Sequence, residues 1–185
     1  VVRQDFPNGR TIWDGISDAV KLSGGDVRLS ADGGFDERPD VAIVVFGEKP
    51  YAEFQGDTPT LDYQPSGASD LALLKKLKGQ GIPVVAIFLS GRPLFTNPEI
   101  NAADAFVAAW LPGTQGDGVA DVLIAGPDGK ARGDFTGRLP FPWPADARSP
   151  VEKPLFPMGY GLDYSAMSDL PQLSEDPAID IAQAV

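Results

Sequence analysis

The sequence contains neither cysteine nor histidine among its 185 residues. These absences exclude disulfide bonds, thiol redox chemistry, Ser-His or Cys-His nucleophile pairs and zinc sites built from these side chains. Any acid–base chemistry near neutral pH must therefore use a carboxylate or a lysine. Because no apolar run approaches the roughly 18 residues of a membrane-spanning helix, we expect no membrane partner.

Basic residues are also few. Only 15 lysines and arginines stand against 26 acidic residues, which gives a net charge of −11. A chain this acidic repels phosphate backbones, so we expect no nucleic-acid partner. Residues 163–185 carry five acidic residues and no basic one, and we expect them to form an acidic tail or a linker to a further domain. The first residue is valine, and we expect the chain to be part of a longer protein.

Apolar residues instead gather in short continuous runs that alternate with helical patterns. The runs predict strands over 41–46, 83–89 and 105–111, with a further short strand over 27–29. The helical patterns cover 11–22 (with Thr11 as cap), 66–78 (with Ser66 as cap), 98–103 and 119–125. Buried strands alternating with helices predict an α/β fold over residues 1–162: a three-layer, Rossmann-like sandwich of a mostly parallel sheet with helices on both faces. From Asp134 onward, frequent proline and glycine predict a wrap without regular structure.

The segment 47–65, which follows the first strand, is a long stretch without clear periodicity. Ligands of parallel sheets bind beyond the carboxyl ends of the strands, and long loops are often functional. The loop carries Glu48, Glu53 and Asp57, with Tyr51 and Phe54 between them. A carboxyl group beside aromatic rings in a partly dry cleft has a raised pKa and can act as a general acid.

Three other motifs favour simpler interpretations. The glycines of PGTQGDG (112–118) do not have the spacing of a nucleotide-binding loop, and Asp117 would repel a phosphate, so we predict a tight turn between strand and helix. Ser66 and Ser90 lack a histidine to activate them and are expected to be cap and turn residues. The acidic segment 32–40 lacks the spacing of a calcium loop.

Several segments carry a more specific signal when they are taken in order. They are VAIVVFGEKPYAEFQGD, VVAIFLSGRPL, AADAFVAAWLPGTQGDGVADVLIAG, DFTGRLPFPWP and PLFPMGYGL, which span residues 41–162. This ordered set resembles glycoside hydrolase family 3, specifically the second, α/β sandwich domain of its β-glucan exohydrolases. TIWDGISDAV (11–20) is similar to the opening helix of that domain.

The resemblance implies a retaining, exo-acting β-glucosidase whose active site lies between two domains. An N-terminal barrel domain supplies an Asp nucleophile, and the second domain supplies a Glu acid/base in a Tyr-x-Glu-x-x-Gly-Asp motif. Here that motif is Tyr51-Ala52-Glu53-Phe54-Gln55-Gly56-Asp57. The resemblance therefore implies that Glu53 is the acid/base, with Glu48 as the alternative, and that Tyr51, Phe54 and Asp57 contact the substrate. A Glu in this loop favours a glucosidase over the hexosaminidase branch of the family.

By the same resemblance the partners are a β-glucoside or a β-1,3/1,4-glucan oligosaccharide and the barrel domain, with no cofactor and no metal, in a periplasmic or secreted protein. The barrel and the Gly-Gly-Trp segment that precedes the opening helix in exohydrolases are absent from these residues, so we expect the chain alone to be inactive. Trp110, within a predicted strand, is expected to be core. Two alternatives stay open: a non-catalytic carbohydrate-binding or scaffold module of the same fold, and a flavodoxin-like or nucleotide-binding module.

Overall fold

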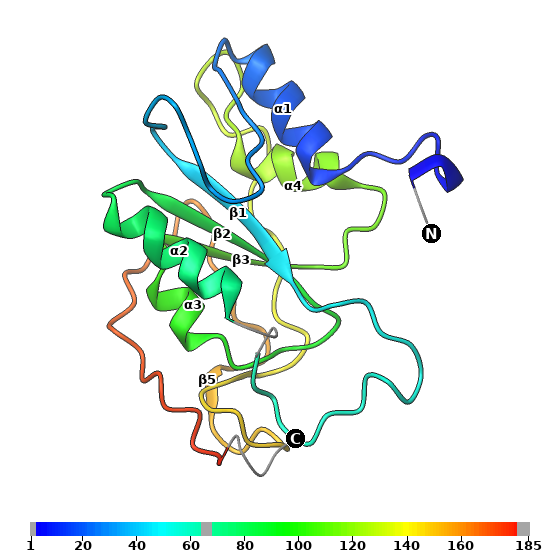
Figure 1. Cartoon of the computed structure of the whole chain (residues 1–185), viewed down its shortest axis with the longest axis vertical. Coiled ribbons are helices and arrows are strands. Elements are labelled where there is room, and N and C mark those ends of the chain that lie inside the picture. The colour runs from blue at the N-terminus through cyan, green and yellow to red at the C-terminus, as the bar shows by residue number, and fades with distance from the viewer. Residues whose placement is uncertain (1–2, 64–67, 181–185) are drawn as a thin grey trace. The chain divides into compact units, whose positions relative to one another are not determined.

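A computed structural model describes residues 3–63 and 68–180 of the chain. Helices and parallel strands alternate along it, as Figure 1 shows. In chain order the elements are η1 (Arg3–Asp5), α1 (Ile12–Leu22), β1 (Ala42–Gly47), α2 (Ser69–Gly79), β2 (Val84–Leu89), α3 (Asn97–Asn101), β3 (Ala105–Trp110), α4 (Gly116–Leu123), β4 (Trp143–Pro144) and β5 (Pro154–Phe156). None of the helices in the described ranges has both the length and the apolar character needed to cross a membrane.

The described residues form two compact units. The first comprises the chain through Gly34, Leu111–Thr136 and Leu162–Met167. The second comprises Phe35–Trp110, Gly137–Gly161 and the chain from Ser168. Each unit is therefore built from segments that lie far apart in the sequence.

In the first unit α1 packs against α4. Helix α1 begins where the sequence predicts, because Thr11 forms a capping box: its hydroxyl accepts from the Asp14 amide at 3.1 Å, and the Asp14 carboxylate accepts from the Thr11 amide at 3.0 Å. Residues 27–29, predicted as a strand, are not one, since no neighbouring strand pairs with them in the described chain.

The glycine-rich turn before α4 is explained by close packing. A Cβ on Gly116 would lie 2.1 Å from the Thr11 carbonyl carbon and 2.3 Å from the Ile12 nitrogen. The Gly116 amide donates to the Arg10 carbonyl at 3.0 Å, and the Arg10 side chain pairs with Asp117 at 3.2 Å. Helix α4 consequently begins at Gly116, three residues before the predicted start.

The second unit contains the predicted parallel sheet, in the order β1-β2-β3. Helix α2 packs on one face of this sheet through Leu74 and Leu77, beside α3 (Figure 1). The predicted α/β class is confirmed. Of these three strands, only β2 is deeply buried. Strands β1 and β3 flank it and are half-buried, although the sequence predicted that they would be buried as well. The predicted helix cap at Ser66 lies outside the described residues.

Aromatic side chains hold this core together. Phe88 on β2 packs against Tyr63 at a centroid distance of 4.9 Å and against Trp143 at 6.2 Å. Trp143 also packs against Trp110, which confirms the expectation that Trp110 contributes to the core. The core therefore links the sheet to the strand β4, which follows it only after a long intervening stretch of sequence.

The proline-rich wrap is not without regular structure, because β4 and β5 pair as a short antiparallel ribbon. The segment after Ser168 is mostly exposed but runs along α3. Asn97 donates to the Ser174 carbonyl at 2.8 Å, and Asn101 both donates to the Leu173 carbonyl (3.0 Å) and accepts from its amide (2.9 Å). This part of the predicted acidic tail is therefore fixed to the unit by hydrogen bonds.

Helix α3 buries a carboxyl group. Glu99 is only 4% exposed, and one of its carboxylate oxygens has no hydrogen-bond partner among the described residues. Burial is the main cause that raises its pKa from 4.5 to about 7, and the nearby charges of Asp62, Asp70 and Glu175 raise it further. Glu99 therefore holds its proton in the folded chain at pH values where it is ionised in the unfolded chain.

Two glycines of α4 provide a matched stability test. Gly116→Ala forces backbone atoms apart and should lower the free energy of unfolding by about 3 kcal/mol. Gly118→Ala meets nothing within 4 Å and should raise it by about 0.5–1 kcal/mol, because alanine is the better helix former. Denaturant unfolding of both variants measures the two effects, and equal effects would contradict the packing described here.

Glu99 makes the stability of the chain depend on pH. Because the folded state binds this proton more tightly than the unfolded state, the free energy of unfolding should fall as pH rises from about 4 to 7. Glu99→Gln keeps the neutral form, so at pH 8 it should be more stable than the parent chain by on the order of 3 kcal/mol, and about equal to it at pH 4. Denaturant unfolding across this pH range is the measurement. Glu37→Gln, at an exposed position, is the control, and parallel pH curves for parent and Glu99→Gln would refute the prediction.

Candidate functional site

The candidate site begins where two neighbouring parallel strands end. In the sheet Gly47 of β1 is paired with Leu89 of β2, and the Glu48 amide donates to the Leu89 carbonyl at 3.0 Å. A Cβ on Gly47 would lie 2.0 Å from that carbonyl oxygen, so only glycine allows this close approach. The register therefore places Glu48 and Ser90, which follow the two strands, side by side.

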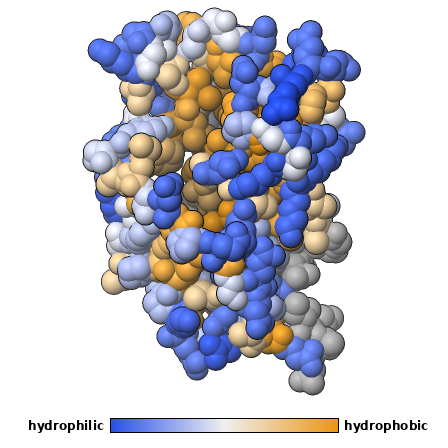
Figure 2. Space-filling model, turned by 90° about the vertical axis from the view of Figure 1, so that its left-hand side faces the viewer, coloured by the Kyte–Doolittle hydropathy of each residue, from blue (hydrophilic) through white to orange (hydrophobic). Residues whose placement is uncertain are grey.

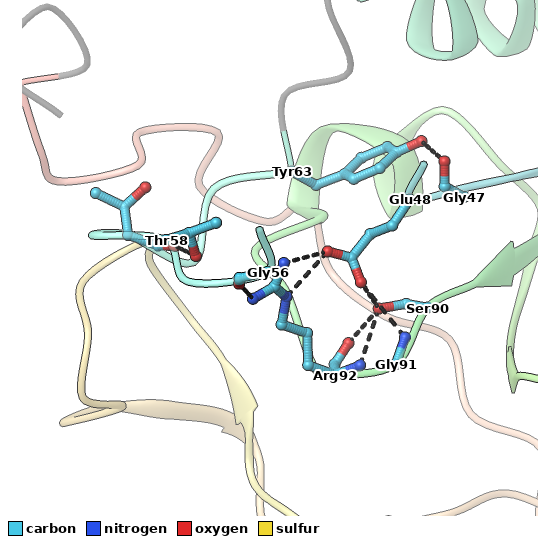
Figure 3. A network of polar contacts seen from close by, with 9 residues as sticks. Gly47, Glu48, Gly56, Thr58, Tyr63, Ser90, Gly91 and Arg92 are labelled. Carbon is cyan, nitrogen blue, oxygen red and sulfur yellow. Dashed lines mark hydrogen bonds and ion pairs between the residues drawn. The ribbon is translucent and has the colours of Figure 1, made fainter. Parts of the chain in front are cut away.

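Glu48 forms an ion pair with Arg92 at this edge (Figure 3). The Arg92 Nε and Nη2 groups donate to Glu48 Oε1 at 2.9 and 2.8 Å. The Ser90 hydroxyl donates to the other oxygen, Oε2, at 2.7 Å. The side chains of Arg92 and Glu48 are only 25% and 13% exposed, so the pair is less screened than an ordinary surface ion pair. Both oxygens of Glu48 are thus occupied by donors.

Arg92 also reaches the loop that follows β1. Its Nη1 group donates to the Gly56 carbonyl (Figure 3). Its guanidinium carbon lies 4.6 Å from the centre of the Tyr51 ring, within the range of a cation–π contact. The Tyr51 ring in turn lies against Gly56, where a Cβ would approach a ring carbon to 2.4 Å. Arg92, Tyr51 and Gly56 therefore form one packed group.

Glu53 lies in the turn between these contacts. The turn is closed by the amides of Gln55 and Gly56, which donate to the Ala52 carbonyl at 3.1 and 3.2 Å. Phe54 has a positive φ of 67°, which is uncommon for a residue with a side chain. The turn presents Glu53 and Phe54 outward from a loop whose two ends are fixed.

The four predicted site residues share this loop, and all of them are exposed. Phe54 is 82% exposed and Tyr51 is 43% exposed, while Glu53 and Asp57 are exposed without a hydrogen bond or ion pair in the part of the chain that the structure describes. The partly dry cleft that we expected around the carboxyl group is therefore not formed by residues 3–63 and 68–180. Other apolar side chains also reach the surface, as the orange areas of Figure 2 show for one face.

Tyr63 fixes the start of the loop from the core side. Its hydroxyl lies 2.7 Å from Asp70 Oδ2, to which it donates, and 3.2 Å from the Gly47 carbonyl oxygen. Burial, together with the hydrogen bond to Asp70, raises the pKa of Tyr63, so the phenol stays a hydrogen-bond donor. This contact links the end of β1 to α2.

The sequence analysis assigned no role to Arg92. Its partner Glu48 lies 44 residues away in the sequence, and local patterns do not report such pairs. The available signal was their position in the sequence, because Glu48 and Arg92 each lie within three residues of the end of a predicted strand (41–46 and 83–89). Ser90 is the turn residue we predicted, since its hydroxyl accepts from the Arg92 amide at 3.1 Å.

A concavity away from the candidate site, between α2 and the segment after Ser168, has a volume of about 290 Å³. Its charges are paired, Lys75 with Glu175 at 3.8 Å and Lys78 with Asp104 at 3.4 Å. The lining contains no aromatic side chain, and its residues are Lys75, Lys78, Gly79, Asn101, Ala102, Gln172 and Glu175. No group of three or more acidic side chains that suits a metal ion occurs within residues 3–63 and 68–180.

Curated relatives of the chain are glycosidases. The chain is 32% identical over 143 residues to the lysosomal beta glucosidase of Dictyostelium discoideum, covering 70% of this chain and 16% of that protein. It is 30% identical over 155 residues to the periplasmic beta-glucosidase of Salmonella typhimurium, covering 71% and 20%. The chain thus spans about a fifth of the length of these relatives.

A solved structure matches over almost the whole chain. The exo-1,3/1,4-beta-glucanase of a Pseudoalteromonas species is 48% identical and superimposes with a TM-score of 0.93, covering 97% of this chain and 23% of that one. The profile described as the glycosyl hydrolase family 3 C-terminal domain matches residues 2–164. The chain therefore belongs to glycosyl hydrolase family 3 and corresponds to the C-terminal domain of that family.

Proposed function

We propose that this chain supplies the acid/base residue, Glu53, of a retaining, exo-acting β-glucosidase that cleaves β-1,3/1,4-glucans. The observation that carries the proposal is the placement of Glu53, exposed and without a partner in the described chain, on a loop fixed to the carboxyl edge of the parallel sheet. The proposal also rests on the motif from Tyr51 to Asp57 and on the 48% identity to an exo-1,3/1,4-beta-glucanase.

The first chemical step would be protonation of the glycosidic oxygen by the Glu53 carboxylic acid. A carboxylate of an N-terminal barrel domain attacks the anomeric carbon, the carbon–oxygen bond breaks, and the aglycone leaves as an alcohol. In the second step the Glu53 carboxylate takes a proton from water as the water oxygen attacks the same carbon and releases the barrel carboxylate. Retention requires the two carboxyl groups to lie about 5–5.5 Å apart.

Glu48, the alternative acid/base, is less suited to this role. Its two oxygens accept hydrogen bonds from Arg92 and Ser90, so neither is free to hold a proton for a substrate. Glu53 has no such competition within the described chain. We therefore assign proton transfer to Glu53 and a structural role to Glu48.

The exposure of the site residues favours a site that a second domain completes. We propose that Tyr51, Phe54 and Asp57 contact the sugar or its aglycone once the barrel domain covers the loop. No metal or cofactor takes part in this proposal. The periplasmic relative supports a periplasmic or secreted enzyme, and the segment 163–185 is proposed to be an acidic tail or a linker to a further domain.

Glu53→Gln, made in a protein that joins this chain to its barrel domain, should lower kcat/KM by about 10²–10⁴-fold for glucosides with poor leaving groups. Activated aryl glucosides, which leave without protonation, should still form the covalent intermediate. Azide, which attacks without losing a proton, should then raise their turnover and yield glucosyl azide. Steady-state kinetics and product analysis measure this, with Glu37→Gln as the control. Unchanged turnover of poor-leaving-group substrates would reject the assignment.

The alternative of a carbohydrate-binding module gives a different result with the 185 residues alone. Because the sugar site is completed by a second domain in our proposal, titration with laminarin oligosaccharides should give no saturable binding up to millimolar concentration. Isothermal calorimetry measures this. Saturable binding that Glu53→Gln leaves unchanged would favour the binding-module function.

A further inference from the structure

We propose that Arg92 is a positioning residue that holds the turn carrying Glu53 in its catalytic placement. The inference deepens the proposed function and rests on Glu53 being the acid/base. In this inference Arg92 fixes the position of the loop relative to the sheet and does not itself contact the substrate.

The first argument is that Arg92 contacts the loop on both sides of Glu53. Before Glu53 it binds the Glu48 carboxylate and covers the Tyr51 ring, and after Glu53 it binds the Gly56 carbonyl. One guanidinium group therefore bridges the two ends of a short turn. Movement of either end would break contacts at the other.

The second argument is that Arg92 is itself fixed to the sheet. The Ser90 hydroxyl accepts from the Arg92 amide at 3.1 Å and lies 2.7 Å from Glu48 Oε2, and the Ser90 amide donates to the Trp110 carbonyl at 3.2 Å. Ser90 is 2% exposed, so these contacts are held within the protein. A continuous path of contacts thus runs from β2 through Ser90 and Arg92 to the turn.

The third argument is that the backbone of the turn itself is not bonded to the sheet. Within the described chain, the backbone of residues 50–57 forms no hydrogen bond to a strand. The backbone bonds inside the turn join Ala52 only to Gln55 and Gly56. The contacts of Arg92 therefore join the sheet to the loop on both sides of Glu53.

The chemistry of the guanidinium explains why arginine is needed. Nε and Nη2 lie on one edge of the plane and bind Glu48, Nη1 binds Gly56, and the guanidinium carbon lies over the Tyr51 ring. A lysine ammonium keeps the charge but cannot make these contacts at once. All three nitrogens are engaged within the chain, so the guanidinium serves to hold the loop.

The test uses Arg92→Met and Arg92→Lys in the protein that contains the barrel domain. Both should lower kcat/KM by about 10–100-fold for glucosides with poor leaving groups, since a displacement of the proton donor by about 1 Å is costly. Activated aryl glucosides, which do not need the proton, should lose less than about threefold in the step that forms the intermediate. Equal losses for both classes of substrate would overturn the inference, because a general folding defect would act on both.

Arg148→Met is the matched control. Arg148 also makes a two-nitrogen ion pair with a carboxylate, that of Asp146, but in the described chain its hydrogen bonds and ion pairs go to Asp146 and Glu152 and not to residues 48–57. It should leave the leaving-group dependence unchanged. Thermal unfolding identifies any variant that is not folded, and Arg92→Lys, which retains the stem and the charge, serves if Arg92→Met does not fold.

The double variant with Glu53→Gln separates the two proposals. If Arg92 acts through Glu53, adding Arg92→Lys to Glu53→Gln should cause less than a twofold further loss. A further loss as large as that of Arg92→Lys alone would overturn the positioning role while leaving Glu53 as the acid/base. If Glu53→Gln alone retains full activity on poor leaving groups, the proposed function itself fails.

Discussion

The ion pair between Glu48 and Arg92 is the constraint on which the rest of the site depends. It joins the residues that follow two neighbouring strands, and it is mostly enclosed. Removing one partner from such a pair is costly, because the other charge is left without compensation. The pair can persist here because a hydroxyl and two further acceptors, the Gly56 carbonyl and the Tyr51 ring, complete the surroundings of both charges. The geometry of the loop follows from this arrangement.

The pair in turn depends on the register of the sheet. Parallel pairing brings the carboxyl ends of β1 and β2 to the same edge, and Gly47 permits the close approach to Leu89 that aligns Glu48 with Ser90. The aromatic core, centred on Phe88, fixes β2 in place. Packing of the apolar core therefore fixes the strands. The register of the strands in turn fixes the position of the loop that carries Glu53.

Much of the fold could be predicted from sequence, because its main signals are local. Apolar runs marked the three parallel strands, and Thr11 marked the start of α1. The errors concern features set by distant partners. The start of α4 depends on contact between Gly116 and Thr11, residues 27–29 had strand-like composition but no neighbour to pair with, and the ribbon of β4 and β5 joins two separate segments of a proline-rich stretch.

The residues of the candidate site likewise divide into those that local sequence patterns indicate and those whose partners are distant in the sequence. Glu53 was predicted from a motif whose residues are contiguous, whereas Arg92 and the buried Glu99 were missed because burial and pairing across tens of residues leave no local pattern. The expected dry surroundings of Glu53 were not found, and the physical reason is that an exposed turn of one domain cannot exclude water without a second surface. The chain accordingly supplies what rigid packing within one domain can supply, the position of a carboxyl group. In the proposed function the desolvation of this carboxyl group comes from the surface of a second domain, because a single exposed turn cannot exclude water by itself.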